Sequence, residues 1–276
     1  MRLALCAVVL AGASAACAPD PDDAGRAGAP PEPVSFIEGT DGPLWLGAPP
    51  AALPIADDVL AEATRGVMPL RAIGCGAVSN GTAFVVAPGL LVGAAHVIAG
   101  ASKVEVDASP GGTVTAAAQP VEVVGYSEER DLALLRTDAA VSPLSIDRAR
   151  LGGMAAVLGY PEGSALEASP ARIEHYVSAS GLWGDGMRRR VYVLAVNVRA
   201  GQSGAPLVDP HGSVVGVAFA TTSGPSDIGF ALSREELLGF LASSGVDARI
   251  DYLGRTVVRA QPAKLRRVPN GACALR

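Results

Sequence analysis

The sequence predicts an all-β protein made of two similar halves. Its 276 residues include 33 glycines and 21 prolines, and this many turn-forming residues argues against a helical bundle. Hydrophobic residues make up 49% of the chain and charged residues only 18%, so the chain can bury a substantial core. Apolar runs of four to eight residues recur between Gly, Pro, Asn and Asp. Short buried strands joined by turns explain all three observations.

Residues 1–17 predict a secretory signal. Arg2 supplies a short positive start, residues 3–12 form an uncharged apolar run, and residues 13–17 are small. The run is too short for a permanent transmembrane helix, and no later segment offers about 18 uncharged apolar residues. We therefore expect export to the periplasm, the cell envelope or the medium.

Two ways of processing this signal remain open. One is ordinary cleavage after Ala15 or Ala16. The other is lipoprotein processing, in which Cys17 becomes the lipidated first residue. Ser14 stands where lipoprotein signals usually carry leucine, so the motif alone does not choose between them.

Residues 18–55 are expected to form a disordered tether, and residues 56–276 a folded domain. The tether is rich in Pro, Ala and Gly and lacks apolar periodicity. Trp45 and Leu46 interrupt it, and either dock on the folded domain or stand exposed. The first folded element is a short helix over residues 58–64.

The apolar runs predict strands on both sides of a linker over residues 141–153. A capping box from Ser233 to Glu236 starts one helix, which ends before Gly245. The predicted strands cover residues 82–87, 90–93, 103–106, 121–126, 132–136, 155–160, 172–180, 191–197, 205–208, 214–220 and 228–231.

The charge balance excludes one class of partner. Lys and Arg number 22 against 27 Asp and Glu, a net charge of −5. This gives no basic footprint for nucleic acid or for an anionic membrane. The membrane contact that we expect is a lipid anchor at Cys17, if that cysteine is acylated.

The segment Gly201–Val208 has the pattern of a nucleophile loop. Ser203 stands between Gln202 and Gly204, and a Pro and a buried strand follow. A tight glycine turn can project the hydroxyl and converge backbone N–H groups on one point, as acyl transfer requires. The same pattern occurs by chance in glycine-rich loops.

A serine nucleophile also needs a general base and a carboxylate that orients this base, and His96 and Asp131 are the candidates. His96 follows two alanines after a predicted strand, which allows close approach to another segment, unlike His175 and His211, the other two histidines. Asp131 heads a buried strand, where a carboxylate needs a partner.

Other interpretations of these residues are weaker. A lone histidine is more often structural, and Asp131 could simply cap a turn. Asp107 and Asp138 are rivals, but neither opens a clean apolar strand. The order His, Asp, Ser is that of the chymotrypsin type, whereas α/β-hydrolases place the nucleophile first.

Several motifs resemble the trypsin-like, HtrA-like bacterial serine proteases. These are Gly81–Gly89, Ala94–Val97, Asp131–Leu135 and Gly201–Val208. A similarity to the periplasmic acid-resistance proteases of actinobacteria extends over residues 60–275, through residues 158–163, 169–173 and 271–273. The resemblance implies two six-stranded antiparallel β-barrels of the chymotrypsin type, with a short C-terminal helix and a site in the cleft between the barrels.

The resemblance also implies roles for residues. His96 would be the base, Asp131 its orienting group and Ser203 the nucleophile, with the N–H groups of Gly201 and Ser203 as oxyanion hole. A disulfide would join Cys75 to Cys273, which leaves Cys17 unpaired in the mature chain unless lipid caps it. The substrate would be a protein or peptide, and neither metal nor organic cofactor is needed.

The nucleophile loop departs from the family pattern at two positions. Such proteases usually carry Asn or Asp before the serine and a second Gly after it, where this chain has Gln202 and Ala205. Gln202 has no carboxylate to pair with a freshly cut N-terminus, so we do not expect activation by that ion pair. No PDZ domain is expected, which predicts a single-domain enzyme, soluble or lipid-tethered. The competing hypothesis is a catalytically impaired module of this fold that only holds peptides.

Overall fold

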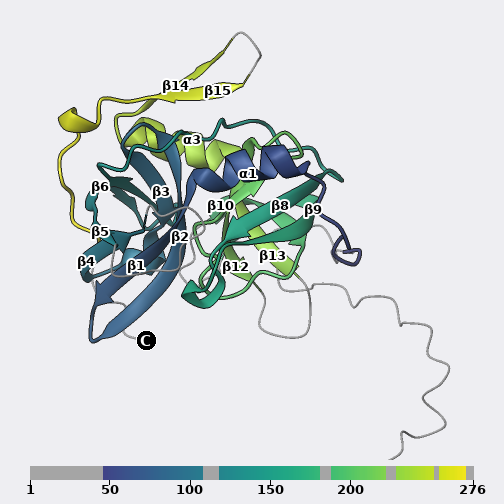
Figure 1. The fold of residues 1–276 in the computed structure, drawn as a ribbon, viewed down its shortest axis with the longest axis horizontal. Coiled ribbons are helices and arrows are strands. Elements are labelled where there is room, and N and C mark those ends of the chain that lie inside the picture. Colours follow the sequence, from purple (N-terminus) through teal and green to yellow (C-terminus); the bar gives the residue numbers. More distant parts are fainter. Residues whose placement is uncertain (1–45, 108–117, 181–187, 222–227, 252–254, 272–276) are drawn as a thin grey trace, which may run out of the picture. The chain divides into compact units, whose positions relative to one another are not determined.

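The computed structural model describes residues 46–107, 118–180, 188–221, 228–251 and 255–271 (Figure 1). They belong to one compact unit, Pro33–Arg276. The predicted signal, Cys17, the tether up to residue 45 and Cys273 lie outside the described residues. Within the described ranges, no helix has the length and apolarity needed to cross a membrane.

The N-terminal half is a seven-stranded antiparallel sheet in the order β5-β4-β1-β2-β3-β7-β6. The last two residues of β4 also pair with the two-residue β5. Its two outer strands, β5 and β6, are separated only by Val121, so the sheet curls without a ladder that closes it. The strands are β1 Val67–Gly74, β2 Ala77–Ala87, β3 Leu90–Ala94, β4 Ala101–Val106, β5 Gln119–Pro120, β6 Glu122–Ser127 and β7 Leu132–Arg136.

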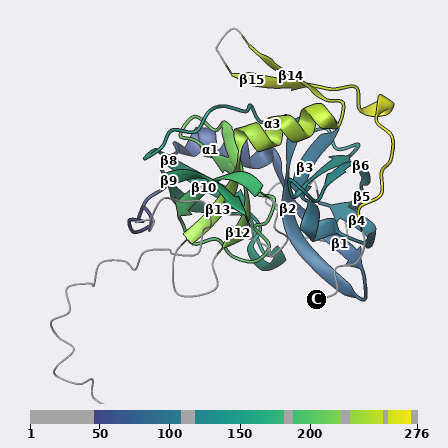
Figure 2. The ribbon, with the colours of Figure 1, turned by 180° about the vertical axis from the view of Figure 1, so that it is seen from behind.

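The C-terminal half is a closed six-stranded barrel in the order β10-β13-β12-β11-β8-β9. A separate hairpin, β14 Asp247–Ile250 with β15 Thr256–Arg259, follows it and projects from the body in both views (Figures 1 and 2). The barrel strands are β8 Met154–Gly159, β9 Glu167–Ser180, β10 Arg188–Ala195, β11 Pro206–Val208, β12 Val214–Thr221 and β13 Ile228–Ser233.

Strand alternation divides the buried side chains into separate clusters. In β8, Ala155 and Val157 belong to a cluster confined to the C-terminal half, whereas Ala156 and Leu158 belong to a core shared with the N-terminal half. Neighbouring residues separate in this way because successive side chains of a strand point to opposite faces. The shared core therefore holds the two halves together.

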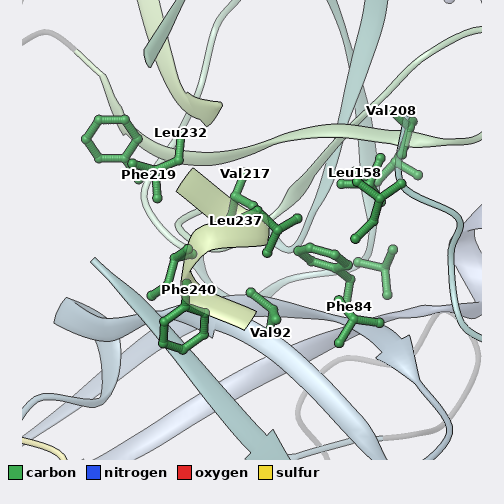
Figure 3. Close-up of a cluster of buried hydrophobic side chains, with 14 of the residues drawn as sticks. Phe84, Val92, Leu158, Val208, Val217, Phe219, Leu232, Leu237 and Phe240 are labelled. Carbon is green, nitrogen blue, oxygen red and sulfur yellow. The ribbon is translucent and has the colours of Figure 1, made fainter. Parts of the chain in front are cut away.

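Helix α3, Arg234–Ser243, completes this shared core. Figure 3 shows Leu237 between Val217 of β12 and Val92 of β3, with Phe240 on the Val92 side of the same cluster. The Ser233 hydroxyl accepts a hydrogen bond from the Glu236 N–H at 3.4 Å, so the predicted N-cap is present. Burial of one helix face against both halves fixes α3 across them.

Two shorter α-helices lie elsewhere in the part of the chain that the structure describes. The predicted first helix is present as α1, Asp57–Arg65. The second, α2 Ala95–Ile98, is a single turn directly after β3 that the sequence did not predict. One-turn helices also cover residues 161–163 and 262–264.

The predicted strands agree well with the structure, and the all-β prediction is confirmed. The N-terminal half differs in detail, because it has seven strands and no closing ladder. Strands β1, β5, β14 and β15 were not predicted. β1 contains Pro69, which argues against a strand, and the other three are short and polar. Leu46, at the end of the predicted tether, is 8% exposed and packs on the shared core.

Candidate active site

His96 and Asp131 are brought together by two neighbouring strands. β3 pairs with β7 so that Ala94 lies opposite Leu132. His96 lies in α2 just after β3, and Asp131 lies in the turn just before β7. Because the strands are antiparallel, these flanking residues meet at one end of the sheet. The His96 Nδ1 lies 2.7 Å from the Asp131 Oδ2.

The Asp131 carboxylate is fully engaged by this segment. The Asp131 Oδ1 accepts a hydrogen bond from the His96 backbone N–H at 2.8 Å. The Asp131 backbone carbonyl accepts one from the Ala95 N–H at 3.1 Å. The Asp131 side chain is 5% exposed, against 35% for His96. Asp131 also has a φ of 52°, in the left-handed region that Asp tolerates better than most residues. The carboxylate is thus fixed, and the imidazole reaches solvent.

The nucleophile loop packs directly against the segment that carries His96. A Cβ on Gly204, which has a φ of 87°, would lie 2.7 Å from the Ala94 N and 2.3 Å from the Thr82 O. The Ser203 carbonyl in turn accepts the Thr82 N–H at 2.9 Å. Only glycine allows so close an approach, which brings Ser203 beside the start of α2. The Ser203 hydroxyl donates to the Phe219 carbonyl at 3.4 Å.

Two backbone N–H groups of the loop are left without a partner. Within the described residues, neither the Gly201 nor the Ser203 N–H donates a hydrogen bond. The Ala200 carbonyl accepts the Glu162 N–H at 2.6 Å, and a trans peptide then points the Gly201 N–H the opposite way. Unpaired N–H groups are rare where backbone is not open to solvent, and a pair of them on one loop is what an oxyanion hole requires.

Thr82 fixes the Gly201 peptide from the N-terminal half. Its hydroxyl donates to the Gly201 carbonyl at 2.9 Å and accepts the Tyr160 N–H at 3.0 Å. Thr82 is fully buried. Sequence reasoning did not single out this residue, because a threonine in a strand needs no explanation beyond β-propensity.

Gln202 fixes the same turn from the C-terminal half. Its Oε1 accepts the Arg199 N–H at 2.8 Å, and its Nε2 donates to the Ser169 hydroxyl at 3.2 Å. Gln202 and Ala205 are both fully buried, and both abut Gly159, whose missing Cβ leaves them room. The two departures from the family pattern are therefore accommodated by neighbouring residues.

The rival residues occupy other places. His175 lies in β9 opposite Val193, and the His211 N–H donates to Asp209 in a turn. Asp107 is buried at the end of β4, and Asp138 is exposed after β7. The structure places none of them in the His96–Asp131 pair.

The described residues contain no group of three or more His, Cys, Asp or Glu side chains that could hold a metal ion. The sequence predicts that the reaction needs neither a metal nor an organic cofactor, and this stays a prediction. An imidazole and a carboxylate are in contact here, and the loop that carries a hydroxyl and two amide N–H groups packs against the same segment. These are the groups that acyl transfer uses.

This fold is that of the trypsin-like serine proteases. A family model described as a trypsin-like peptidase domain matches residues 81–217, which include His96, Asp131 and Ser203. The chain belongs to this family, and its fold is chymotrypsin-like.

Individual relatives sharpen the comparison. The chain is 34% identical over 211 residues to the serine protease Rv3671c of Mycobacterium tuberculosis, covering 72% of this chain and 51% of that one. It thus spans about half the length of this relative. The crystal structure of the Rv3671c protease in its active form has a TM-score of 0.66 at 30% identity, covering 89% of this chain and 99% of that chain.

A more distant relative has a similar description. A probable periplasmic DegP-like serine endoprotease of Chlamydia trachomatis is 29% identical over 197 residues, covering 64% of this chain and 36% of that one. The HtrA-like similarity expected from the sequence is present in the fold, since a structure of the HtrA-type protease AlgW has a TM-score of 0.60 at 24% identity, covering 67% of this chain and 62% of that chain.

Proposed function

We propose that this chain is an exported serine endopeptidase that works through His96, Asp131 and Ser203. The observation that carries the proposal is the 2.7 Å contact between the His96 Nδ1 and the Asp131 Oδ2. With the Nδ1 proton donated to the carboxylate, Nε2 carries the lone pair that can accept the Ser203 proton. The family membership supports the same assignment.

The proposed reaction has two halves. The Ser203 hydroxyl leaves the Phe219 carbonyl, passes its proton to His96 Nε2, and its Oγ bonds to the substrate carbonyl carbon. The resulting oxyanion is stabilised by the N–H groups of Gly201 and Ser203. His96 then gives the proton to the leaving amine, and the peptide bond breaks. Water repeats these steps on the acyl-enzyme and releases the acid.

Gln202 supports a loop that is ordered without proteolytic activation. Its two hydrogen bonds are to Arg199 and Ser169, both inside the chain, and neither needs a new N-terminus. We therefore propose that the mature enzyme needs no cleavage to order its oxyanion hole.

Fluorophosphonate labelling tests the catalytic proposal. The intact protein should react at one residue, Ser203, located by peptide mass spectrometry, and Ser203→Ala should not react. Hydrolysis of an unfolded protein substrate should be lost in the same variant. If the intact protein labels no faster than Ser203→Ala, the enzyme proposal fails. Peptide binding by the unlabelled protein would then favour the impaired module.

Export and lipidation are proposed on the sequence, supported by envelope relatives such as the periplasmic DegP-like protein. Mass spectrometry of the mature N-terminus decides between the two ways of processing. A diacylglyceryl-modified Cys17 supports the lipid anchor, and an unmodified Ala16 or Cys17 start excludes it.

The Cys75–Cys273 disulfide is proposed on the position of Asn270. Its side chain donates to the Ile98 and Ala101 carbonyls at 2.7 and 2.9 Å, and its carbonyl accepts the Gly100 N–H. The Cys75 Sγ lies 3.4 Å from the Gly100 carbonyl oxygen, so the chain returns to Cys75 three residues before Cys273. Closing a loop of about 200 residues stabilises by about 5 kcal/mol in the chain-entropy account. A non-reducing peptide map without this link would exclude it.

A further inference from the structure

A buried charged cluster lies behind the Asp131 turn. Glu236 of α3 is 8% exposed, although its carboxylate is ionisable. Its Oε1 accepts from the Arg190 backbone N–H at 3.2 Å and from the Arg190 Nε at 3.1 Å. Its Oε2 lies 3.3 Å from the Arg130 Nε, which is not aligned for a hydrogen bond within the described residues, so this contact is electrostatic.

Arg130 directly precedes Asp131 in the turn between β6 and β7. The guanidinium lies over Gly239 of α3, where a Cβ would be 3.5 Å from the Arg130 Nε. Glycine at this point leaves the face of the helix open for Arg130. The ion pair therefore ties the residue next to Asp131 to a helix that begins after the last barrel strand.

A second arginine holds the other end of the same turn. Arg189 of β10 is 2% exposed and donates from Nη2 to the Glu128 carbonyl at 2.9 Å. That carbonyl also accepts the Asp131 N–H at 3.1 Å. The backbone group that positions Asp131 thus has a second contact, again from the C-terminal half.

Stability alone does not explain this arrangement. Partly buried ion pairs add little net stability, because desolvation offsets the attraction. Asp131 meanwhile has a φ of 52°, a conformation that costs free energy in a non-glycine residue and persists only when its surroundings hold it. The strain is local to the turn that the two arginines hold.

We propose that Arg130, Glu236 and Arg189 form a turn clamp, a set of positioning residues through which the C-terminal half holds Asp131 against His96. This inference rests on the proposed function, and none of the three residues touches the substrate. The clamp joins the carboxylate, which the N-terminal half supplies, to the half that supplies Ser203. The hydrogen bond from His96 to Asp131 then depends on how the two halves are packed.

The Glu236→Gln substitution tests the Arg130 contact selectively. The glutamine Oε1 can keep the bonds to Arg190, but its amide then faces Arg130 and the attraction is lost. We expect kcat for a peptide substrate to fall about tenfold with KM within twofold, because Asp131 is held less firmly against His96 while substrate binding is unchanged. Arg130→Gln should give the same result and serves if Glu236→Gln does not fold.

Arg190→Gln is the matched control. It removes an ion pair to the same carboxylate, and the Arg190 backbone N–H still holds Glu236. A role in stability alone predicts similar losses of melting temperature and kcat in all three variants. The turn clamp predicts that Arg190→Gln keeps kcat within twofold. An equal loss of kcat in Arg190→Gln, or unchanged kcat in Glu236→Gln and Arg130→Gln, overturns the proposal.

A spectroscopic readout separates this inference from the proposed function. In the inactive Ser203→Ala protein, the His96 Nδ1 proton should give a downfield NMR signal, assigned by its loss in His96→Ala. Adding Glu236→Gln should broaden or shift that signal, and adding Arg190→Gln should not. An unchanged signal in the Glu236→Gln protein contradicts the turn clamp, whether or not the wild type hydrolyses peptides.

Discussion

Thr82 is a single residue that links the two halves at the nucleophile loop. Its hydroxyl both donates to the Gly201 carbonyl and accepts the Tyr160 N–H. The Gly201 carbonyl belongs to the peptide bond between residues 201 and 202. The preceding peptide bond, between residues 200 and 201, carries the N–H that points into the proposed oxyanion hole. A buried hydroxyl with two backbone partners therefore orients a group that acts in the transition state.

Replacing Thr82 by valine should reduce both activity and stability. Valine keeps the shape but leaves a backbone carbonyl and N–H unsatisfied, which costs about 1–3 kcal/mol each. We expect kcat to fall about tenfold and the free energy of unfolding, measured by denaturant titration, to fall by a few kcal/mol. Thr82→Ser keeps the hydroxyl and should retain most activity. If Thr82→Val is as active as the wild type, the hydroxyl does not order the loop.

Asp131→Asn should remove the charge while keeping the backbone. Asparagine tolerates the left-handed region as well as aspartate does, so the φ of 52° adds no new strain. Loss of the corresponding carboxylate in the general triad mechanism costs about 10⁴ in kcat, and we expect about 10³–10⁴ here. The melting temperature should change little. A loss below tenfold would mean that Asp131 does not orient His96.

Among the elements, the loop from Gly201 to Ala205 depends on close contact with β2 and β3. Gly204 approaches the backbone of Thr82 and Ala94 so nearly that any side chain would overlap it. This contact sets the distance between the nucleophile and the helix that carries His96. The spacing of the site is thus decided by backbone packing between two elements.

Gly204→Ala should abolish activity, and Gly152→Ala is its control. Both glycines have positive φ, 87° and 74°, but a Cβ on Gly152 would meet nothing within 4 Å. Alanine at residue 152 should therefore cost only about 1 kcal/mol of backbone strain. Alanine at residue 204 adds a clash that displaces Ser203. Fluorophosphonate labelling and thermal melting of both variants measure the difference, and equal behaviour would contradict the contact.

At the scale of the whole molecule, the raised pKa values of three tyrosines reflect how deeply their side chains are buried. Burial raises the pKa values of Tyr126, Tyr160 and Tyr192 to about 12, with smaller contributions from nearby carboxylates. Tyr126 lies in the N-terminal sheet and Tyr192 in the C-terminal barrel, while Tyr160 is fully buried in the shared core. Ionisation of these tyrosines at high pH should therefore destabilise both halves.

Stability should fall as pH rises from about 10 toward 12. The unfolded tyrosines ionise near pH 10 and the folded ones near 12, so the folded protein keeps its protons while the unfolded chain loses them. Two pH units correspond to about 3 kcal/mol for a fully buried group such as Tyr160. Melting temperatures from pH 8 to 11.5 measure the loss.

Tyr160→Phe should flatten that pH dependence. It removes one ionising group, and it also removes the hydrogen bond from the Tyr160 hydroxyl to the Val67 carbonyl at 3.1 Å, which costs about 1 kcal/mol at neutral pH. The variant should be less stable at pH 8 and closer to the wild type at pH 11. A parallel offset at all pH values would show that Tyr160 does not titrate late.

The sequence by itself determined most of the strand pattern and the N-cap of α3, and it predicted His96, Asp131 and Ser203 as the reacting groups. These follow from local chemistry: alternation of buried residues, a capping box, and small residues around a nucleophile. The one-turn helix α2 was not predicted, because four residues are too few to show a helical periodicity. The polar hairpin β14–β15 was not predicted either, because it buries little apolar surface.

Only the tertiary structure decided how the site is held. Thr82, Glu236 and Arg189 look ordinary in the sequence, and their partners lie 119, 46 and 61 residues away along the chain. Such contacts depend on the packing of two halves through a shared core, which no local pattern encodes. The sequence predicts the reacting groups because their chemistry restricts the residue type. The groups that position them are set by long-range geometry, which many residue types can satisfy.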